Sequence, residues 1–150
     1  MAEGTVQTIQ VDAPAEVVFG VAADVGRFPE WAAAVRETEV LDTNEDGTPA
    51  RATLVVDGMI RTITYTLNYT YDGIARISWS AEPGDDIAEM DGRYEFYELE
   101  EGGTEVVYAL KVEPNFKVPG LLRRQAEKQI VGTALRGLRD RAEELASASD

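Results

Sequence analysis

The sequence predicts an α+β fold in which a long C-terminal helix packs across a curved antiparallel sheet of about seven strands. Three observations predict it. Residues 36–113 form a series of short segments in which apolar and polar side chains alternate, tight turns link these segments, and residues 120–145 change to a helical period. Links this short do not allow parallel crossovers, so the strands are expected to pair as an antiparallel meander. A sheet with one apolar face must bury it, and only the C-terminal helix is large enough.

The N-terminal part is expected to form one strand and two short helices. Residues 5–11 are rich in β-branched side chains, which is typical of a strand. Pro14 suits the first turn of a helix that continues to about residue 23. Pro29 limits a second helix around Phe28. Two helices this short need a larger element to pack against.

The meander contributes the other strands. The clearest of them, residues 62–71, alternates Thr and Asn with Ile, Leu and Tyr, as a half-buried strand does, and Asp72-Gly73 after it is a hairpin signal. Near its end the fifth segment loses its alternation between Phe96 and Tyr97, which predicts a bulge or a bend there. The segments are expected at residues 36–41, 50–56, 62–71, 75–81, 88–99 and 104–112.

The C-terminal helix is expected to span roughly 38 Å at 1.5 Å per residue, which is long enough to cross a sheet. Gly132 and Gly137 interrupt it, and either close packing or room for a ligand explains them. We expect one domain over residues 1–146 and a frayed tail at residues 147–150. The stripe expected to be buried consists of Leu122, Ala126, Ile130, Ala134, Leu138, Ala142 and Leu145.

Composition excludes several classes of function. The chain has no Cys and no His, so thiol catalysis and iron–sulfur sites are excluded, and we expect neither a metal nor a cofactor. Fourteen basic and 28 acidic residues give a net charge of −14, which opposes binding to nucleic acid. The sequence shows no signal-peptide pattern and no apolar segment of membrane-spanning length. We therefore expect a cytoplasmic protein without membrane insertion, as a monomer or weak homodimer.

A ligand pocket is expected where the twisted sheet and the straight helix diverge. Buried tyrosines need partners for their hydroxyls, so a group of them suits an apolar pocket with a few polar contacts, although each tyrosine alone is equally explained as a core residue. The expected lining is Trp31, Leu54, Val56, Tyr65, Leu67, Tyr69, Trp79, Tyr94, Phe96, Tyr108, Leu110, Leu122, Gln125, Gln129 and Thr133.

Several local motifs resemble one known superfamily. Residues 11–19 resemble its first strand and helix start, Phe28-Pro29-Glu30-Trp31 its second-helix signature, and residues 92–96 with 102–106 its last hairpin. With the order of the elements, they make the chain similar to the START/Bet v 1-like (SRPBCC) superfamily, and closest to its bacterial polyketide cyclase/dehydrase-like branch. The resemblance implies a helix-grip fold and a hydrophobic ligand such as a lipid, sterol, polyketide, hormone or quinone; only some members are enzymes.

Three functions stay open at this point. The first is a carrier or sensor of a small hydrophobic molecule. The second is a polyketide aromatase/cyclase, for which Tyr65, Tyr69, Tyr94 and Arg93 are weak candidates, since alternation with Tyr94 places Arg93 outward. The third is a protein-interaction or toxin–antitoxin role, which the acidic surface would serve. No acid–base pair is evident, so the catalytic residues are unknown and the sequence favours binding over catalysis.

Overall fold

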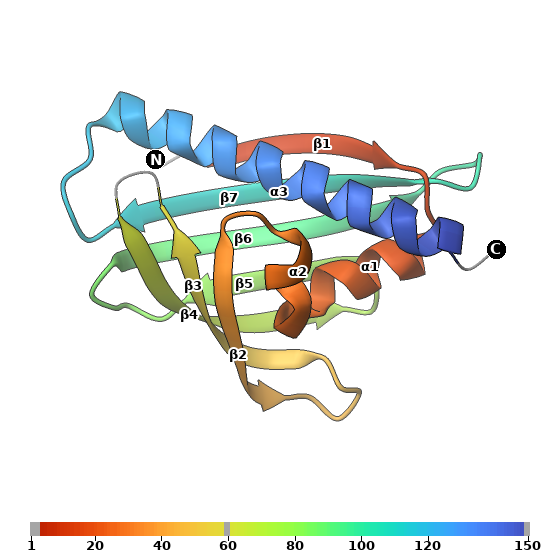
Figure 1. Ribbon diagram of the computed structural model, residues 1–150, viewed down its shortest axis with the longest axis horizontal. Coiled ribbons are helices and arrows are strands. Elements are labelled where there is room, and N and C mark those ends of the chain that lie inside the picture. Colours follow the sequence, from red (N-terminus) through yellow and green to blue (C-terminus); the bar gives the residue numbers. More distant parts are fainter. Residues whose placement is uncertain (1–3, 59–60, 149–150) are drawn as a thin grey trace.

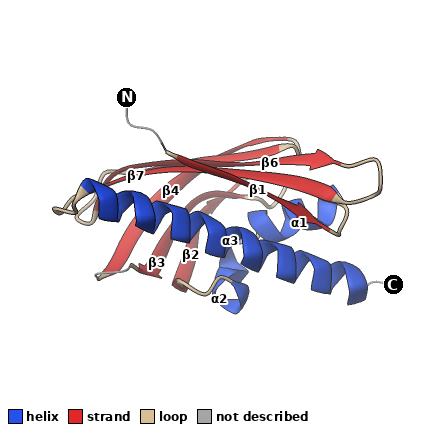
Figure 2. Cartoon of the chain, turned by 90° about the horizontal axis from the view of Figure 1, so that it is seen from above, coloured by secondary structure: helices blue, strands red, loops and turns tan. Residues whose placement is uncertain are grey.

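The computed structural model describes residues 4–58 and 61–148, and its elements follow the predicted order. A seven-stranded antiparallel sheet forms one layer, and the helices cover one of its faces (Figures 1 and 2). This arrangement confirms the predicted helix-grip fold. The strands are β1 (Thr5–Val11), β2 (Val35–Thr43), β3 (Pro49–Asp57), β4 (Thr62–Asp72), β5 (Arg76–Ala81), β6 (Ile87–Glu98) and β7 (Thr104–Pro114). The helices are α1 (Ala15–Ala23), α2 (Phe28–Trp31) and α3 (Gly120–Ala148), with a 3-10 turn at Val25–Arg27.

The sheet has the order β1-β7-β6-β5-β4-β3-β2, so β1 closes the meander by pairing with the last strand. Every pair is antiparallel, as the short links predict. The predicted turns after β4 and β6 contain Gly73 at φ 54° and Gly102 at φ 96°, a left-handed conformation that favours glycine. Figure 2 shows the β2–β3 end of the sheet bending toward the helices, which gives the sheet a concave inner face.

The bulge predicted between Phe96 and Tyr97 is wrong. The register of β6 against β7 runs without a break from Glu89 to Glu98, and its shift lies at the other end, between Ile87 and Glu89. The sequence pattern misleads because Tyr97 is an exposed aromatic on the outer face, where its hydroxyl donates to Glu95 at 2.8 Å. Its position in the ladder is regular.

The buried face of α3 agrees with the predicted stripe at Leu138 and Ala142 and differs from it at Ile130 and Leu145. Val131, Leu135, Leu138 and Ala142 are buried, whereas Ile130 is 44% exposed and Leu145 is 40% exposed. Both sets have a helical period, and one residue along the chain turns a helix by about 100°. The first half of the helix is rotated toward the sheet edge, where the Gln7 side chain of β1 donates to a backbone carbonyl of α3. The helix also continues through Ala148, and the rest of the tail expected to fray, residues 149–150, lies outside the described residues.

A buried carboxylate joins α3 to the sheet. Glu127 is 5% exposed, and its side chain accepts hydrogen bonds from the backbone N–H of Val112 at 2.9 Å and from the Thr5 hydroxyl at 3.4 Å. Within the described residues β1 pairs with β7 only as far as Leu110, so Val112 has no partner in the described part of that strand. Glu127 therefore accepts the hydrogen bond of the Val112 backbone N–H in place of a carbonyl of β1.

Gly137 in α3 is explained by close packing. A Cβ atom placed there would lie 3.2 Å from the Trp31 ring and 3.2 Å from its backbone oxygen. Any larger side chain would push α2 away from α3, so of the two explanations for this glycine the structure supports tight packing rather than room for a ligand.

Candidate functional site

The inner face of the sheet carries a continuous cluster of aromatic rings. Trp79 of β5 is at its centre, with ring centroids 6.2 Å from Tyr69, 5.3 Å from Tyr94 and 5.7 Å from Tyr108. Antiparallel pairing brings the rings together, because residues directly opposite on neighbouring strands, such as Tyr94 and Tyr108, place their side chains on one face. The Tyr94 and Tyr108 centroids are 4.5 Å apart. Aromatic side chains from four neighbouring strands thus form one surface facing the helices.

The four tyrosines of this surface are buried or partly buried, and their hydroxyls make no hydrogen bond with any described residue. They are Tyr65, Tyr69, Tyr94 and Tyr108. Among the described residues, only the Thr38 hydroxyl is both fully enclosed and without a partner. The four tyrosine oxygens are therefore not fully enclosed. Each hydroxyl therefore borders accessible space on the helix side of the sheet. Tyr71, by contrast, donates to the backbone oxygen of Pro49 at 2.6 Å.

Burial also controls the protonation of these groups. Desolvation raises the pKa of Tyr65 to about 12, and it also raises the pKa values of Tyr69, Tyr94 and Tyr108 well above the ordinary value of 10. A smaller contribution to the raised pKa of Tyr94 comes from the charge that Tyr65 would carry. At neutral pH all four remain uncharged hydrogen-bond donors and are poor general bases.

The structure distributes the residues of the predicted lining over three environments. Most of those on the sheet lie buried on the inner face: Leu54, Leu67, Tyr69, Trp79, Tyr94, Phe96, Tyr108 and Leu110. Partly buried against this core are Trp31, Val56 and Tyr65. On α3, Leu122 and Thr133 are partly exposed, whereas Gln125 and Gln129 are exposed. Each glutamine is two residues from a buried one, about 200° around the helix, so both point away from the sheet.

Two features of the inner face were absent from the predicted lining. Phe19 of α1 packs its ring edge-on against Tyr71 and Phe96, at 6.2 and 6.1 Å between centroids. Thr38 of β2 has a buried hydroxyl without a partner, and it lies opposite Leu54. Apolar spacing in a short helix indicates that Phe19 is buried, but the partner it meets depends on how α1 crosses the sheet.

The β3–β4, β5–β6 and β7–α3 loops lie together at one end of the molecule (Figure 1). Arg61, at the start of β4, donates to Asp86 in the β5–β6 loop at 2.9 Å, and its guanidinium lies 4.8 Å from the ring centroid of Phe116 in the β7–α3 loop. Asp86 also accepts a hydrogen bond from the backbone N–H of Thr64 at 2.9 Å. We call Arg61, Asp86 and Phe116 the loop clamp. The sequence gives no sign of it because the three residues are far apart along the chain.

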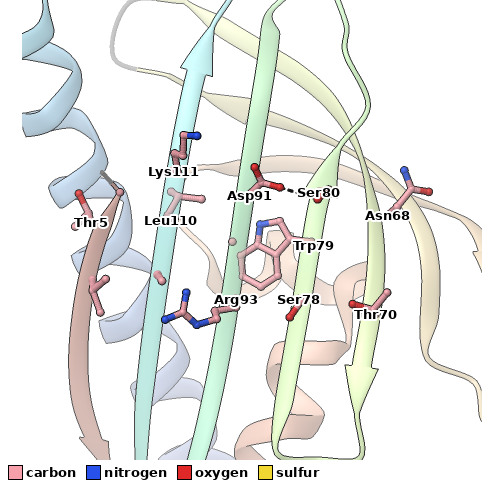
Figure 3. A pocket seen from close by; sticks show the side chains of 14 residues that line it. Thr5, Asn68, Thr70, Ser78, Trp79, Ser80, Asp91, Arg93, Leu110 and Lys111 are labelled. Carbon is pink, nitrogen blue, oxygen red and sulfur yellow. Dashed lines mark hydrogen bonds between the residues drawn. The ribbon is translucent and has the colours of Figure 1, made fainter. Parts of the chain in front are cut away.

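The opposite face of the sheet is hollowed and carries several polar side chains. A hollow of about 590 Å³ lies over β4, β5, β6 and β7, bordered by the N-terminal end of β1 (Figure 3). Figure 3 shows its polar side chains, among which Ser80 donates to Asp91 at 2.7 Å. Arg93 is on this face and is paired with Glu95 at 3.0 Å, so it points outward, as its alternation with Tyr94 predicts. The hollow therefore lies on the outer side of the sheet, and Trp79, the centre of the aromatic cluster, is also among its lining residues.

The residues that the structure describes contain no group of three or more acidic side chains that could hold a metal ion. Nor does any helix in residues 4–58 and 61–148 have the length and apolar character needed to cross a membrane.

The family model for polyketide cyclase/dehydrase and lipid transport proteins matches residues 11–139 of the chain. This match includes every helix and strand except part of β1 and the end of α3. The chain therefore belongs to this family, as the motif resemblance predicts. No curated protein matches the sequence.

Solved structures show the same fold. A START superfamily protein from Mycobacterium smegmatis has a TM-score of 0.87 at 22% identity, over 95% of this chain and 99% of that one. The Zhui aromatase/cyclase from Streptomyces sp. R1128 has a TM-score of 0.80 at 18% identity, over 93% of each chain. A STAR-related lipid transfer protein from Xanthomonas axonopodis has a TM-score of 0.71 at 20% identity, over 91% of this chain and 84% of that one. At these identities the likeness establishes the fold.

Proposed function

We propose that the protein binds a small hydrophobic molecule, as a carrier or sensor, between the inner face of the sheet and α3. One observation carries the proposal: four tyrosine hydroxyls on an otherwise apolar surface border accessible space and have no partner among the described residues. A buried donor without an acceptor costs about 1–3 kcal/mol, and a ligand or water in that space relieves this cost. Apolar walls with a few convergent polar groups are the usual composition of ligand pockets.

The comparisons agree with a binding role. The family is described by cyclisation and by lipid transport, and relatives of both kinds share the fold. We further propose that the protein acts in the cytoplasm as a monomer or weak homodimer. Native mass spectrometry of freshly purified protein tests both the state of assembly and the presence of a co-purified ligand.

Binding is tested by fluorescence titration with N-phenyl-1-naphthylamine, an uncharged apolar dye. Two variants of β3 form a matched pair: Val56 points to the inner face, where it is packed against the core, and Val55 is its neighbour on the outer face. Saturable one-to-one binding is expected. Val56→Trp should fill part of the space and weaken binding at least about tenfold, while Val55→Trp should leave it unchanged.

Failure of the dye and of hydrophobic extracts to form any saturable complex would refute the proposal. Equal weakening by both tryptophan variants would show that the dye does not bind beneath α3. Thermal melts of both variants confirm that each is folded at the temperature of the titration.

The second candidate is an aromatase/cyclase, favoured by the fold shared with the Zhui enzyme over 93% of the chain. In this chain the four tyrosines would take part as uncharged hydrogen-bond donors to a substrate oxygen, because their raised pKa values keep them protonated. Turnover of a poly-β-ketone substrate that falls in Tyr94→Phe would support it. Binding of the same substrate without any change in the product mixture would favour the carrier role.

A further inference from the structure

The two faces of the sheet differ in how many charged side chains they carry. The register places Thr38, Tyr65, Tyr94 and Tyr108 on the inner face. None of the buried residues of the described strands is Asp, Glu, Lys or Arg, and Glu98, which the register also places on this face, is exposed at the end of β6. The charged side chains of the central strands point outward instead. On that side Arg51 pairs with Glu82, Arg93 with Glu95, and Lys111 with Glu89.

Two charged side chains of α3 that are largely buried already have partners. The carboxylate of Glu127 is occupied by Val112 and Thr5. Arg141, which is 21% exposed in its side chain, is paired with Glu30 of α2 at 2.7 Å. The side of α3 that meets Trp31 carries small residues: Gly137, which lies against Trp31, and Thr133 and Ala134 one turn earlier. A ligand in this space thus meets hydroxyls and aromatic rings.

Hydroxyl donors without acceptors define what the ligand must offer. Each tyrosine hydroxyl can donate one hydrogen bond, and none of the four oxygens is fully enclosed without a partner. Carbonyl, ether or hydroxyl oxygens would accept these bonds. A carboxylate would accept them as well, but it would be buried without a cation, which costs several kcal/mol, and it would approach a protein of net charge −14.

We infer that the ligand is an uncharged molecule with apolar bulk and at least one ketone-, quinone- or ether-type oxygen, held by hydroxyls of the tyrosine quartet. Here the tyrosine quartet means Tyr65, Tyr69, Tyr94 and Tyr108. This inference rests on the proposed function and narrows it, since free fatty acids and other carboxylates are then poor ligands and pure hydrocarbons bind without the oxygen-specific contribution.

The test uses two sets of probes that differ only in the group in question. The chain set is heptadecan-9-one, heptadecane and heptadecanoate, and the ring set is anthraquinone, anthracene and anthraquinone-2-carboxylate. Each probe displaces N-phenyl-1-naphthylamine from the wild-type protein, from Tyr94→Phe and Tyr108→Phe, and from the control Tyr97→Phe. The Tyr97 hydroxyl is on the outer face and donates to Glu95.

In at least one set, the uncharged oxygenated probe should bind about five- to tenfold more tightly than both its hydrocarbon and its carboxylate counterparts, which is the effect of one or more neutral hydrogen bonds. Tyr94→Phe or Tyr108→Phe should reduce this preference several-fold, and Tyr97→Phe should leave it intact. Equal or tighter binding of the hydrocarbon or the carboxylate in both sets would overturn the inference while the proposed binding function stands. An unchanged preference in both inner-face variants would do the same. If no probe binds, both the inference and the proposed function fail.

Discussion

The contact between Gly92 and Trp79 offers the sharpest test of the site's packing. Gly92 of β6 lies opposite Trp79 of β5, and the indole ring rests directly on the glycine. In Gly92→Ala the new Cβ would meet Trp79 Cε2 and Cζ2 at 2.4 Å. Carbon atoms pack at about 3.5–4.0 Å, so the indole would have to move by roughly 1.1–1.6 Å.

The cost of this movement follows from the surroundings of the indole. Trp79 is 8% exposed and touches aromatic rings on three sides, so it has no free direction except toward the space beneath α3. Overpacking of this kind costs about 1–3 kcal/mol, and replacing a strand glycine by alanine returns about 0.5–1 kcal/mol. We expect a net loss of about 1–2 kcal/mol in the free energy of unfolding, or a Tm lower by about 3–6 °C for a chain of this length.

Thermal and urea unfolding measure the loss, near-UV circular dichroism reports the moved indole, and dye titration reports the intrusion into the proposed site. Gly20→Ala is the matched control, because a Cβ at Gly20 in α1 meets nothing within 4 Å. It should raise stability by about 0.5–1 kcal/mol through helix propensity. If Gly92→Ala is as stable as Gly20→Ala and has an unchanged near-UV spectrum, the proposed packing of Trp79 on Gly92 is wrong.

Three further predictions concern the joints around the site. Glu127→Ala should cost about 1.5–3 kcal/mol in urea unfolding because Val112 loses a charged acceptor, whereas Glu127→Gln, which keeps an acceptor oxygen, should cost less; equal and negligible losses would contradict this role. Arg61→Ala should change the free energy of unfolding by less than about 1 kcal/mol, since the Arg61–Asp86 ion pair is partly exposed. It should nevertheless raise the dissociation rate of the dye several-fold, because the loop clamp opens. The control Arg139→Ala, which removes a different exposed ion pair, should leave that rate unchanged. The pKa of Tyr65 is raised to about 12 in the folded chain, against 10 in the unfolded chain, so its contribution to stability is complete below pH 10 and is lost as the pH rises toward 12. In an alkaline titration, ultraviolet absorbance should therefore show tyrosinate forming together with unfolding. Reversible ionisation of the quartet near pH 10 in the folded protein would argue against its burial.

The strands and turns were predictable because their signals are local. Alternation along β4 and the Asp72-Gly73 turn depend on residues adjacent in the chain, and both appear where the sequence predicts them. The same alternation places Tyr65 and Tyr69 on one face of β4. The absence of Cys and His, read from composition alone, already limits the chemistry of the site.

The buried stripe of α3 could not be fully predicted from the local sequence pattern. Ile130 and Val131 are both apolar, and each belongs to a series with a helical period. Which of them is buried depends on how far the helix is rotated about its axis, and contacts with β1 and α1 determine that rotation. Gln125 and Gln129 were assigned to the lining for the same reason, and the same rotation turns them to solvent.

The sequence by itself determined the class of fold, the order of its elements and a tyrosine-rich inner face, because periodicity and turn chemistry act over a few residues. Only the tertiary structure decided that Trp79 rests on Gly92, that the loop clamp joins three connections, and that the hydroxyls of the tyrosine quartet border space without partners. The physical reason is that contacts across strands and between loops depend on register, twist and helix rotation, which are properties of the whole packed chain.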